Sequence, residues 1–329
     1  MSKIKLCTQI CQDNPNADRQ ELITLFMAQV PGITYAGAST YASTVKKTFL
    51  ADAPARAMIM AREEETDNEI AIRLEERFLV IDTLAAASCH SQILSLIISG
   101  PAGLGKSFTT EKAVKEYDPE GDKTIIAKGT VRATGLYQLL HEYRRKGCVI
   151  VLDDADSIFN DPDALNILKA ACDTTEERWI DWRSETKMVD VDGEPIDRTF
   201  HYQGTLIFIT NKDFDAEMSK GGKNAEHYEA LISRSHYVEC DMHHIRDYII
   251  RIKQVVEMGM LRDQRNMTVE ESDMIVRFIE ENSHRLRELT LRMALKLADV
   301  YKLDPDNFHS LAKVSCFKRQ SPKWNDGLI

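Results

Sequence analysis

Short apolar runs and longer helical periods alternate along the middle of the chain. Each apolar run has the length of a buried strand rather than of a helix, and each ends in or beside polar residues. The runs cover residues 93–98, 123–127, 148–154 and 205–211, and helical patterns at 108–116, 136–145 and 161–173 lie between them. Strands that alternate with helices predict an α/β fold, in which a parallel sheet has helices on both faces.

Both ends of the chain show helical periodicity alone. Near the N-terminus, one apolar helical face consists of Leu22, Ile23, Phe26, Met27 and Val30. After the last predicted strand, helical patterns cover residues 243–260, 269–282 and 285–302. We therefore expect five parts: a helical unit (1–50), an acidic linker (51–74), an α/β core (75–240) that begins with a helix at 75–88, a helical region (241–315) and a tail (316–329).

The N-terminal unit has two interpretations. Pro31-Gly32 separates its first apolar helix from a second, polar helix at 38–47, which is the order of a helix-turn-helix. Basic residues only slightly outnumber acidic ones within residues 1–50, which is a weak charge balance for a DNA-binding surface. The other interpretation is a helical hairpin that docks on a protein.

The segment between the first strand and the next helix has the pattern of a phosphate-binding loop. It reads Gly100-Pro101-Ala102-Gly103-Leu104-Gly105-Lys106-Ser107, and Phe108 follows it in the helix. Glycines let backbone N–H groups turn toward phosphates, and the helix adds its positive N-terminal end. We expect these nine residues to bind ATP, with Lys106 on the β- and γ-phosphates and the Ser107 hydroxyl on Mg²⁺.

Two further strands end in side chains that suit the same chemistry. One ends in Asp153-Asp154 and another in Thr210-Asn211. Because parallel strands end at one edge of their sheet, these residues should lie beside the glycine loop. We expect Asp153 to hold Mg²⁺, and Asn211 to orient the attacking water and contact the γ-phosphate.

Composition and charge narrow the class of protein. The chain has 329 residues, 43% of them hydrophobic, and its net charge of −10 argues against a broadly basic surface for nucleic acid. Seven cysteines without a C-x-x-C pair predict reduced thiols and neither a disulfide framework nor a zinc site. No apolar run has membrane-spanning length and no signal-peptide pattern is present, so we expect a cytoplasmic protein with no membrane partner.

In this order, the motifs resemble those of the AAA+ ATPases. Residues 100–107 resemble Walker A, residues 148–154 resemble Walker B, and Thr210-Asn211 resembles sensor 1. Leu231-Ile232-Ser233-Arg234 is similar to the motif that carries the arginine finger of this family. The resemblance covers roughly residues 75–315, and the compact layout is similar to ATPases encoded by bacterial viruses and mobile elements.

The resemblance implies a ring, usually a hexamer, with ATP bound between neighbouring subunits. Arg234 would reach into the site of the next subunit and stabilise charge on the transferring phosphoryl group. The C-terminal helices would form the family's α-helical lid. There, Arg292 matches the sensor 2 position that contacts the γ-phosphate, and Arg287 is the alternative candidate.

The end of Walker B departs from the family pattern. AAA+ ATPases usually have Asp-Glu at this position, and this chain has Asp153-Asp154. The Asp154 carboxylate sits one methylene short, by about 1 Å, and a displacement of this size can cost about a hundredfold in rate. We expect Asp154 still to orient the attacking water, with slow hydrolysis or with support from Asp156.

An extra segment, residues 178–203, precedes the strand at 205. Its centre contains Asp192-Gly193 between strand-like residues, which predicts a β-hairpin. Aromatic and basic residues flank it: Trp179, Trp182, Arg183, Phe200, His201 and Tyr202. The hairpin resembles an insert that some AAA+ groups aim into the ring's channel, where it would grip a polypeptide or stack on single-stranded nucleic acid. Alternatively, these aromatic rings pack the hairpin onto the sheet.

From the resemblance we expect an ATP-hydrolysing motor or switch. Its expected setting is DNA replication, recombination or transposition, for example helicase loading, with DNA or a DNA-processing protein as partner. One alternative is a chaperone-like ATPase that moves a polypeptide. A second is a slow ATP-gated assembly scaffold.

Overall fold

The chain forms two compact units, Met1–Thr66 and Asp67–Ile329, in its computed structural model. The structure describes residues 3–14, 19–35, 37–39, 41–42, 65–175, 177–183, 188–190, 193–242 and 244–319. Most of the expected acidic linker and residues 43–47 of the second predicted N-terminal helix lie outside these ranges. Each unit has a hydrophobic core of its own.

The first unit contains α1 (Lys3–Asp13), which the sequence pattern did not predict, and α2 (Arg19–Gln29). Cys7 and Cys11 of α1 are buried in one core with Leu22 and Phe26 of α2. Met27 was expected in this core, but its side chain is 45% exposed. Only a narrow apolar stripe of α2 packs into this small core, and Met27 lies beside that stripe on the solvent-facing side.

A five-stranded parallel sheet lies at the centre of the second unit, in the order β2-β3-β6-β1-β7. The strands are β1 (Ser95–Ser99), β2 (Thr124–Lys128), β3 (Val149–Asp153), β6 (Thr205–Thr210) and β7 (His236–Glu239). The four predicted strands are confirmed, and only the short, partly exposed edge strand β7 was not predicted. Strand β1 lies between β6 and β7, and the glycine loop follows it. Residues at the ends of β6 and β3 contact this loop through Lys106 and Ser107.

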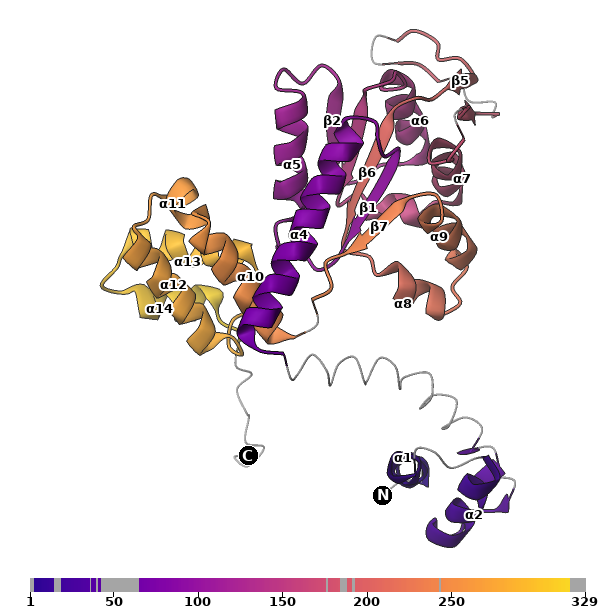
Figure 1. Cartoon of the computed structure of the whole chain (residues 1–329), viewed down its shortest axis with the longest axis vertical. Helices are drawn as coiled ribbons and strands as arrows, with labels where there is room; N and C mark the ends of the chain where they lie inside the picture. Colours follow the sequence, from indigo (N-terminus) through magenta and orange to yellow (C-terminus); the bar gives the residue numbers. More distant parts are fainter. Residues whose placement is uncertain are drawn as a thin grey trace, which may run out of the picture. The chain divides into compact units, whose positions relative to one another are not determined.

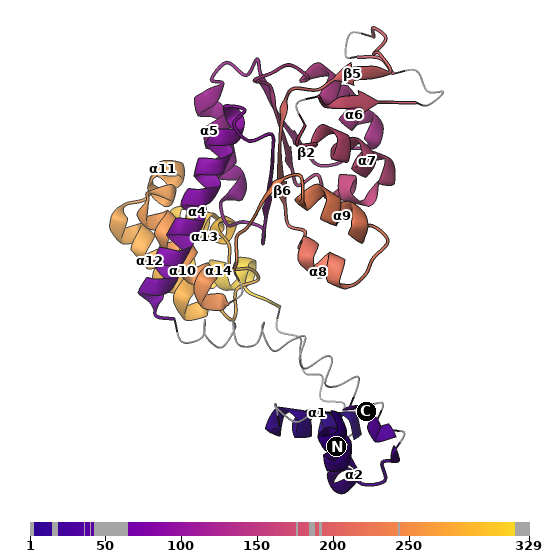
Figure 2. The ribbon, with the colours of Figure 1, turned by 45° about the vertical axis from the view of Figure 1, so that its right-hand side comes forward.

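Helices cover both faces of this sheet (Figures 1 and 2). On one face lie α4 (Asp67–Cys89) and α5 (Lys106–Tyr117), and on the other α6 (Ala133–Glu142), α7 (Pro162–Ala171), α8 (Phe214–Ser219) and α9 (Ala225–Ile232). A short 3-10 helix, Asp156–Asn160, follows β3. Alternate residues of β1 enter the two cores, with Ile97 on the α6 side and Leu96 and Ile98 on the α4 side. The predicted α/β class is confirmed, and the chain has an α/β P-loop NTPase fold.

The C-terminal helices form a separate core that we call the lid (Figure 1). They are α10 (Ile245–Glu257), α11 (Met260–Arg265), α12 (Val269–Asn282), α13 (Leu291–Leu303) and α14 (Phe308–Cys316). The helix predicted at 243–260 is two helices, because Gly259 at φ 109° ends the first and begins the second. The helix predicted from residue 285 begins at Leu291, where the Thr290 hydroxyl accepts a hydrogen bond from the Met293 N–H.

Helix α4 begins at Asp67, earlier than the predicted residue 75, and joins the core to the lid. Its first turns bury Ile70 and Leu74. Arg73 of α4 lies 2.9 Å from the buried carboxylate of Asp247 on α10, and the Gln254 side chain donates to a backbone carbonyl of α4. The helix therefore packs on both parts that surround the glycine loop.

The insert forms the predicted hairpin. Its strands β4 (Trp179–Asp181) and β5 (Thr199–His201) are antiparallel, and a bridge pairs Val189 with Pro195 near the turn. Phe200 and Tyr202 are buried, so for these two rings the packing interpretation holds. Trp179 is 53% exposed and stacks on His201. None of the described helices is long and apolar enough to span a membrane.

Candidate nucleotide-binding site

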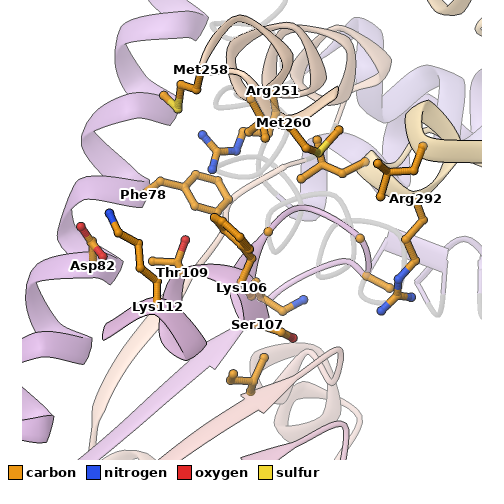
Figure 3. Close-up of a pocket in the computed structure, with 18 of the residues that line it drawn as sticks. Phe78, Asp82, Lys106, Ser107, Thr109, Lys112, Arg251, Met258, Met260 and Arg292 are labelled. Atoms are coloured by element: carbon orange, nitrogen blue, oxygen red, sulfur yellow. The ribbon is translucent and has the colours of Figure 1, made fainter. Parts of the chain in front are cut away.

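A cavity of about 610 Å³ lies between the glycine loop and the lid. Its walls come from the loop, from α4 and α5, from Asp154 and Asn211 at the ends of β3 and β6, and from lid helices α10, α11 and α13 (Figure 3). A cavity of this size and mixed lining is typical of a site for a small organic ligand. These walls come from segments that lie far apart in the sequence, so the cavity forms only when the unit is folded.

The loop needs its glycines for two separate reasons. Gly103 and Gly105 have φ angles of 76° and 102°, a region that residues with a side chain rarely adopt. A Cβ on Gly103 would also lie 2.7 Å from the Thr290 Cβ of the lid. The loop touches the lid at this point, and the Leu291 N–H donates a hydrogen bond of 2.8 Å to the Gly103 carbonyl.

The Lys106 ammonium lies inside the curve of the loop. It donates hydrogen bonds to the carbonyls of Gly100 (2.6 Å) and Pro101 (2.8 Å) and to Asn211 Oδ1 (3.1 Å). Burial lowers the pKa of Lys106, while the negative charge of Asp154 is among the groups that oppose this change. These hydrogen bonds hold the ammonium beside the glycine loop, where Lys106 lines the cavity.

Ser107 and Asp153, the two expected Mg²⁺ ligands, lie side by side. The Ser107 hydroxyl donates to Asp153 Oδ1 at 2.9 Å, and Lys128 Nζ is 3.3 Å from the other carboxylate oxygen. Hydroxyl and carboxylate oxygens are hard donors that suit Mg²⁺. Within the described ranges no group of three or more His, Cys, Asp or Glu residues is placed to hold a metal. An ion here would therefore take its remaining ligands from water and phosphate oxygens, as Mg²⁺ commonly does.

Asp154 and Asn211 form a short network with the lysine. Asn211 Nδ2 donates to Asp154 Oδ1 at 2.9 Å, while its amide oxygen accepts from Lys106. This pairing fixes the amide orientation, because the reversed amide would face the ammonium with a donor. Asp154 has a φ of 53° and its side chain lines the cavity beside Asn211.

Asp156, the expected support of Asp154, bonds to the end of β6. Its carboxylate accepts a hydrogen bond of 2.5 Å from the Thr210 hydroxyl, which in turn accepts from the Lys212 N–H. Asp156 is not among the residues that line the cavity. These bonds tie Asp156 to the turn after β6, and support of Asp154 by Asp156 stays a prediction.

The other predicted loop residues divide between the cavity and the core. Ala102 and Phe108 line the cavity, and Phe108 is exposed. The Leu104 side chain is fully buried in the core on the α4 side. Gly100 and Pro101 contribute carbonyls to Lys106 rather than cavity wall.

Of the two sensor 2 candidates, the structure brings Arg292 to the cavity. Arg292 lies in the first turn of α13 and lines the cavity on the side of the loop (Figure 3). Arg287 is engaged elsewhere, since its Nε donates to the Phe317 carbonyl at 2.9 Å. Arg287 is not among the residues that line the cavity.

Arg234 lies outside the cavity of its own chain. It follows α9, its Nη1 donates to the Ala230 carbonyl at 2.8 Å, and its Nε is 3.9 Å from Asp173 Oδ2. The guanidinium is not among the groups that line the cavity. The same chain therefore does not bring Arg234 to the glycine loop.

Two residues that line the cavity were not predicted from the sequence, Phe78 of α4 and Arg251 of α10 (Figure 3). Arg251 Cζ lies 3.4 Å from the centre of the Phe78 ring. Its Nε donates to the Leu104 carbonyl at 3.4 Å. One signal was available, because Arg251 interrupts the apolar run Ile249-Ile250-Arg251-Ile252 in a predicted helix.

Comparison with known proteins yields a sequence relative and partial structural likenesses. The chain is 34% identical over 252 residues, 76% of each protein, to an uncharacterised 36.7 kDa protein in the nrdC–mobD intergenic region of Enterobacteria phage T4. No protein-family model matches the chain. The RuvB Holliday junction branch migration motor of Thermotoga maritima is 14% identical over 75% of this chain and 68% of its own, with a TM-score of 0.40. NtrX of Brucella abortus in complex with ADP is 12% identical over 94% of this chain and 83% of its own, with a TM-score of 0.38.

Proposed function

This chain belongs to the family of the uncharacterised 36.7 kDa phage T4 protein, and we propose that it is a magnesium-dependent ATPase of the AAA+ type. One observation carries the proposal. Lys106, the Ser107–Asp153 pair and the Asp154–Asn211 pair converge at one edge of the sheet, under a lid that adds Arg292. This set of side chains fits a phosphate-binding lysine, a magnesium site and a carboxylate that orients water, which phosphoryl transfer to water uses.

In this proposal the loop and Lys106 bind the β- and γ-phosphates. Bound Mg²⁺, held by Ser107 and Asp153, supplies charge neutralisation for the phosphate oxygens. Asp154 orients the attacking water and accepts its proton, and Asn211 holds that carboxylate in place through the 2.9 Å hydrogen bond. Arg292 contacts the γ-phosphate from the lid, so the lid position depends on which nucleotide is bound.

Turnover by this site is expected to be slow. The Asp154 carboxylate is already tethered to Asn211, and it is one methylene shorter than the glutamate usual in the resembled family. A water placed about 1 Å from its best position reacts up to about a hundredfold more slowly.

We propose that Arg234 acts in the site of a neighbouring subunit in a ring, as a hexamer would allow. Two features support this. The Arg234 side chain is about one-third exposed, and it does not line the nucleotide cavity of its own chain. A second copy that packs against the open side of the cavity would complete the site with a cation that the chain does not provide to itself.

The partner that fits the insert best is a protein. Trp179, stacked on His201 at 5.1 Å between ring centres, offers an exposed aromatic surface. Carboxylates nevertheless outnumber cations in residues 178–203, which disfavours direct contact with a phosphate backbone. We propose that the ring acts on a DNA-processing protein in replication, recombination or transposition, with helicase loading as an example. The phage origin of the relative is in keeping with such work.

An ATPase assay with and without single- and double-stranded DNA, together with light scattering with and without ATP, tests this function. The proposal predicts Mg²⁺-dependent turnover, ATP-dependent assembly and little direct response to either DNA. Turnover that rises steeply with DNA and falls with salt would replace the protein partner with DNA itself. Stable ATP-dependent rings with almost no turnover would instead identify a scaffold.

A further inference from the structure

Arg251 presents a chemical problem that the proposed roles do not solve. Its side chain is 5% exposed, yet the structure gives it a single hydrogen bond, from Nε to the Leu104 carbonyl. Among the described residues it has no ion pair. Burial lowers its pKa to about 10, so it remains charged at neutral pH. A buried guanidinium without a carboxylate is costly unless another group satisfies its donors.

The surroundings of Arg251 hold it in position for a ligand. Its guanidinium lies over the Phe78 ring, with Cζ 3.4 Å from the ring centre. Its Nη2 lies near the loop, 3.7 Å from where a Cβ on Gly105 would be. Arg251 is one of the residues that line the cavity, so its remaining N–H donors are available to a ligand bound there.

Arg251 and Arg292 approach the cavity from different sides (Figure 3). Arg292 lies toward Lys106 and the strand ends, where the γ-phosphate is proposed to bind. Arg251 lies with Phe78 toward α4, and Asp82, Thr109 and Lys112 line the same cavity on the side of α4 and α5. The two lid arginines are therefore suited to opposite ends of one ligand.

We infer that Arg251 binds the end of the nucleotide that ATP and ADP share, an inference that rests on the proposed function. A guanidinium bonds well to a phosphate and also packs on the π-face of a base, and both groups lie on this shared end. Arg251 is thus a determinant of affinity for any bound nucleotide, whereas Arg292 distinguishes ATP from ADP. Because Arg251 rests on Phe78, the ligand also contacts α4 through this pair.

Titration calorimetry of the full chain with ATP, ADP and adenosine tests this inference. Arg251→Met keeps the length and the contact with Phe78 but removes the charge and the donors. We expect it to weaken both ATP and ADP about ten- to a hundredfold, the worth of a charged hydrogen bond, and to leave their affinity ratio unchanged. Arg277→Met, at an exposed lid arginine, is the matched control and should bind like the wild type.

Each other outcome overturns a defined part of the reasoning. If Arg251→Met binds ATP and ADP as tightly as the wild type, or loses affinity for ATP alone, the inference is wrong. If the wild type itself binds neither, the proposed function fails instead. Arg251→Lys keeps the charge and, should the Met variant not fold, gives the same test, with a smaller loss expected for both nucleotides. Loss of adenosine binding in the same variant assigns Arg251 to the base, and its retention assigns Arg251 to the α-phosphate.

Discussion

Replacing Gly103 by alanine would separate the glycine loop from the lid. The added Cβ would lie 2.7 Å from Thr290 Cβ and 2.9 Å from Thr290 Cγ2, and neither atom is the end of a flexible side chain. Thr290 cannot withdraw freely, because it caps α13 and the next residue, Leu291, is hydrogen-bonded to Gly103. The loop or the start of α13 must therefore move.

The cost has two components that a second variant separates. Alanine at the φ of 76° costs about 1–2 kcal/mol, and overpacking against the lid adds about 1–3 kcal/mol. Gly121→Ala is the matched control, because Gly121 has nearly the same φ, 80°, with nothing within 4 Å of an added Cβ. We expect Gly121→Ala to lower the free energy of unfolding by about 1–2 kcal/mol and Gly103→Ala by about 2–5 kcal/mol.

Urea unfolding followed by tryptophan fluorescence measures both variants. Trp179 and Trp182 belong to the insert of the second unit, so their signal reports the unit that contains the loop. Gly103→Ala should also bind ATP more weakly, since the loop that carries Lys106 is displaced. If Gly103→Ala is no less stable than Gly121→Ala, the loop and the lid do not make the contact on which the cavity depends.

Three further predictions concern the reaction and the lid. Asp154→Asn should keep its ATP affinity within about twofold and lose turnover, because an amide cannot accept the proton of water. Asp156→Asn should keep turnover, and undiminished turnover in Asp154→Asn would remove that residue from the mechanism. Arg234→Ala should be inactive alone, but mixing it with Asp154→Asn should restore part of the ATPase rate, because mixed rings contain sites with both intact groups. No recovery in the mixture would argue against a role in trans. Asp247→Ala removes a carboxylate that is 1% exposed, pairs with Arg73 and accepts the His244 N–H at the start of α10, so we expect a loss of about 3–5 kcal/mol in urea unfolding. Asp299→Ala, at an exposed pair on the lid, should cost less than about 1 kcal/mol, and equal losses would contradict the buried role of Asp247.

The sequence predicted the part of the site that consists of the glycine loop and the ends of β3 and β6. Short apolar runs give strand positions, and parallel strands bring their ends together, so the proximity of Ser107 to Asp153 followed from pattern alone. The order of the strands in the sheet could not be predicted from the pattern, because it depends on how helices and strands pack against one another.

The residues from the lid and from α4 were harder to predict. Arg251 and Phe78 belong to helices far apart in the chain, and only the docking of α10 on α4 brings them together. Asp156 is adjacent to the site in sequence, but the turn after β3 directs its carboxylate to Thr210. Helix periodicity shows which face is buried and does not show what that face meets.

The central claim is that one nucleotide binds with Mg²⁺ where β1, β3 and β6 end, and calorimetric titration of the full chain with ATP and Mg²⁺ tests it most directly. The account predicts one site in the wild type, and binding weakened at least about tenfold in Lys106→Ala, which removes a charged hydrogen-bond donor from the loop. Lys115→Ala, at an exposed lysine of the same helix α5, should bind like the wild type. No binding by the wild type in excess Mg²⁺, or equal binding by folded Lys106→Ala, would contradict the account.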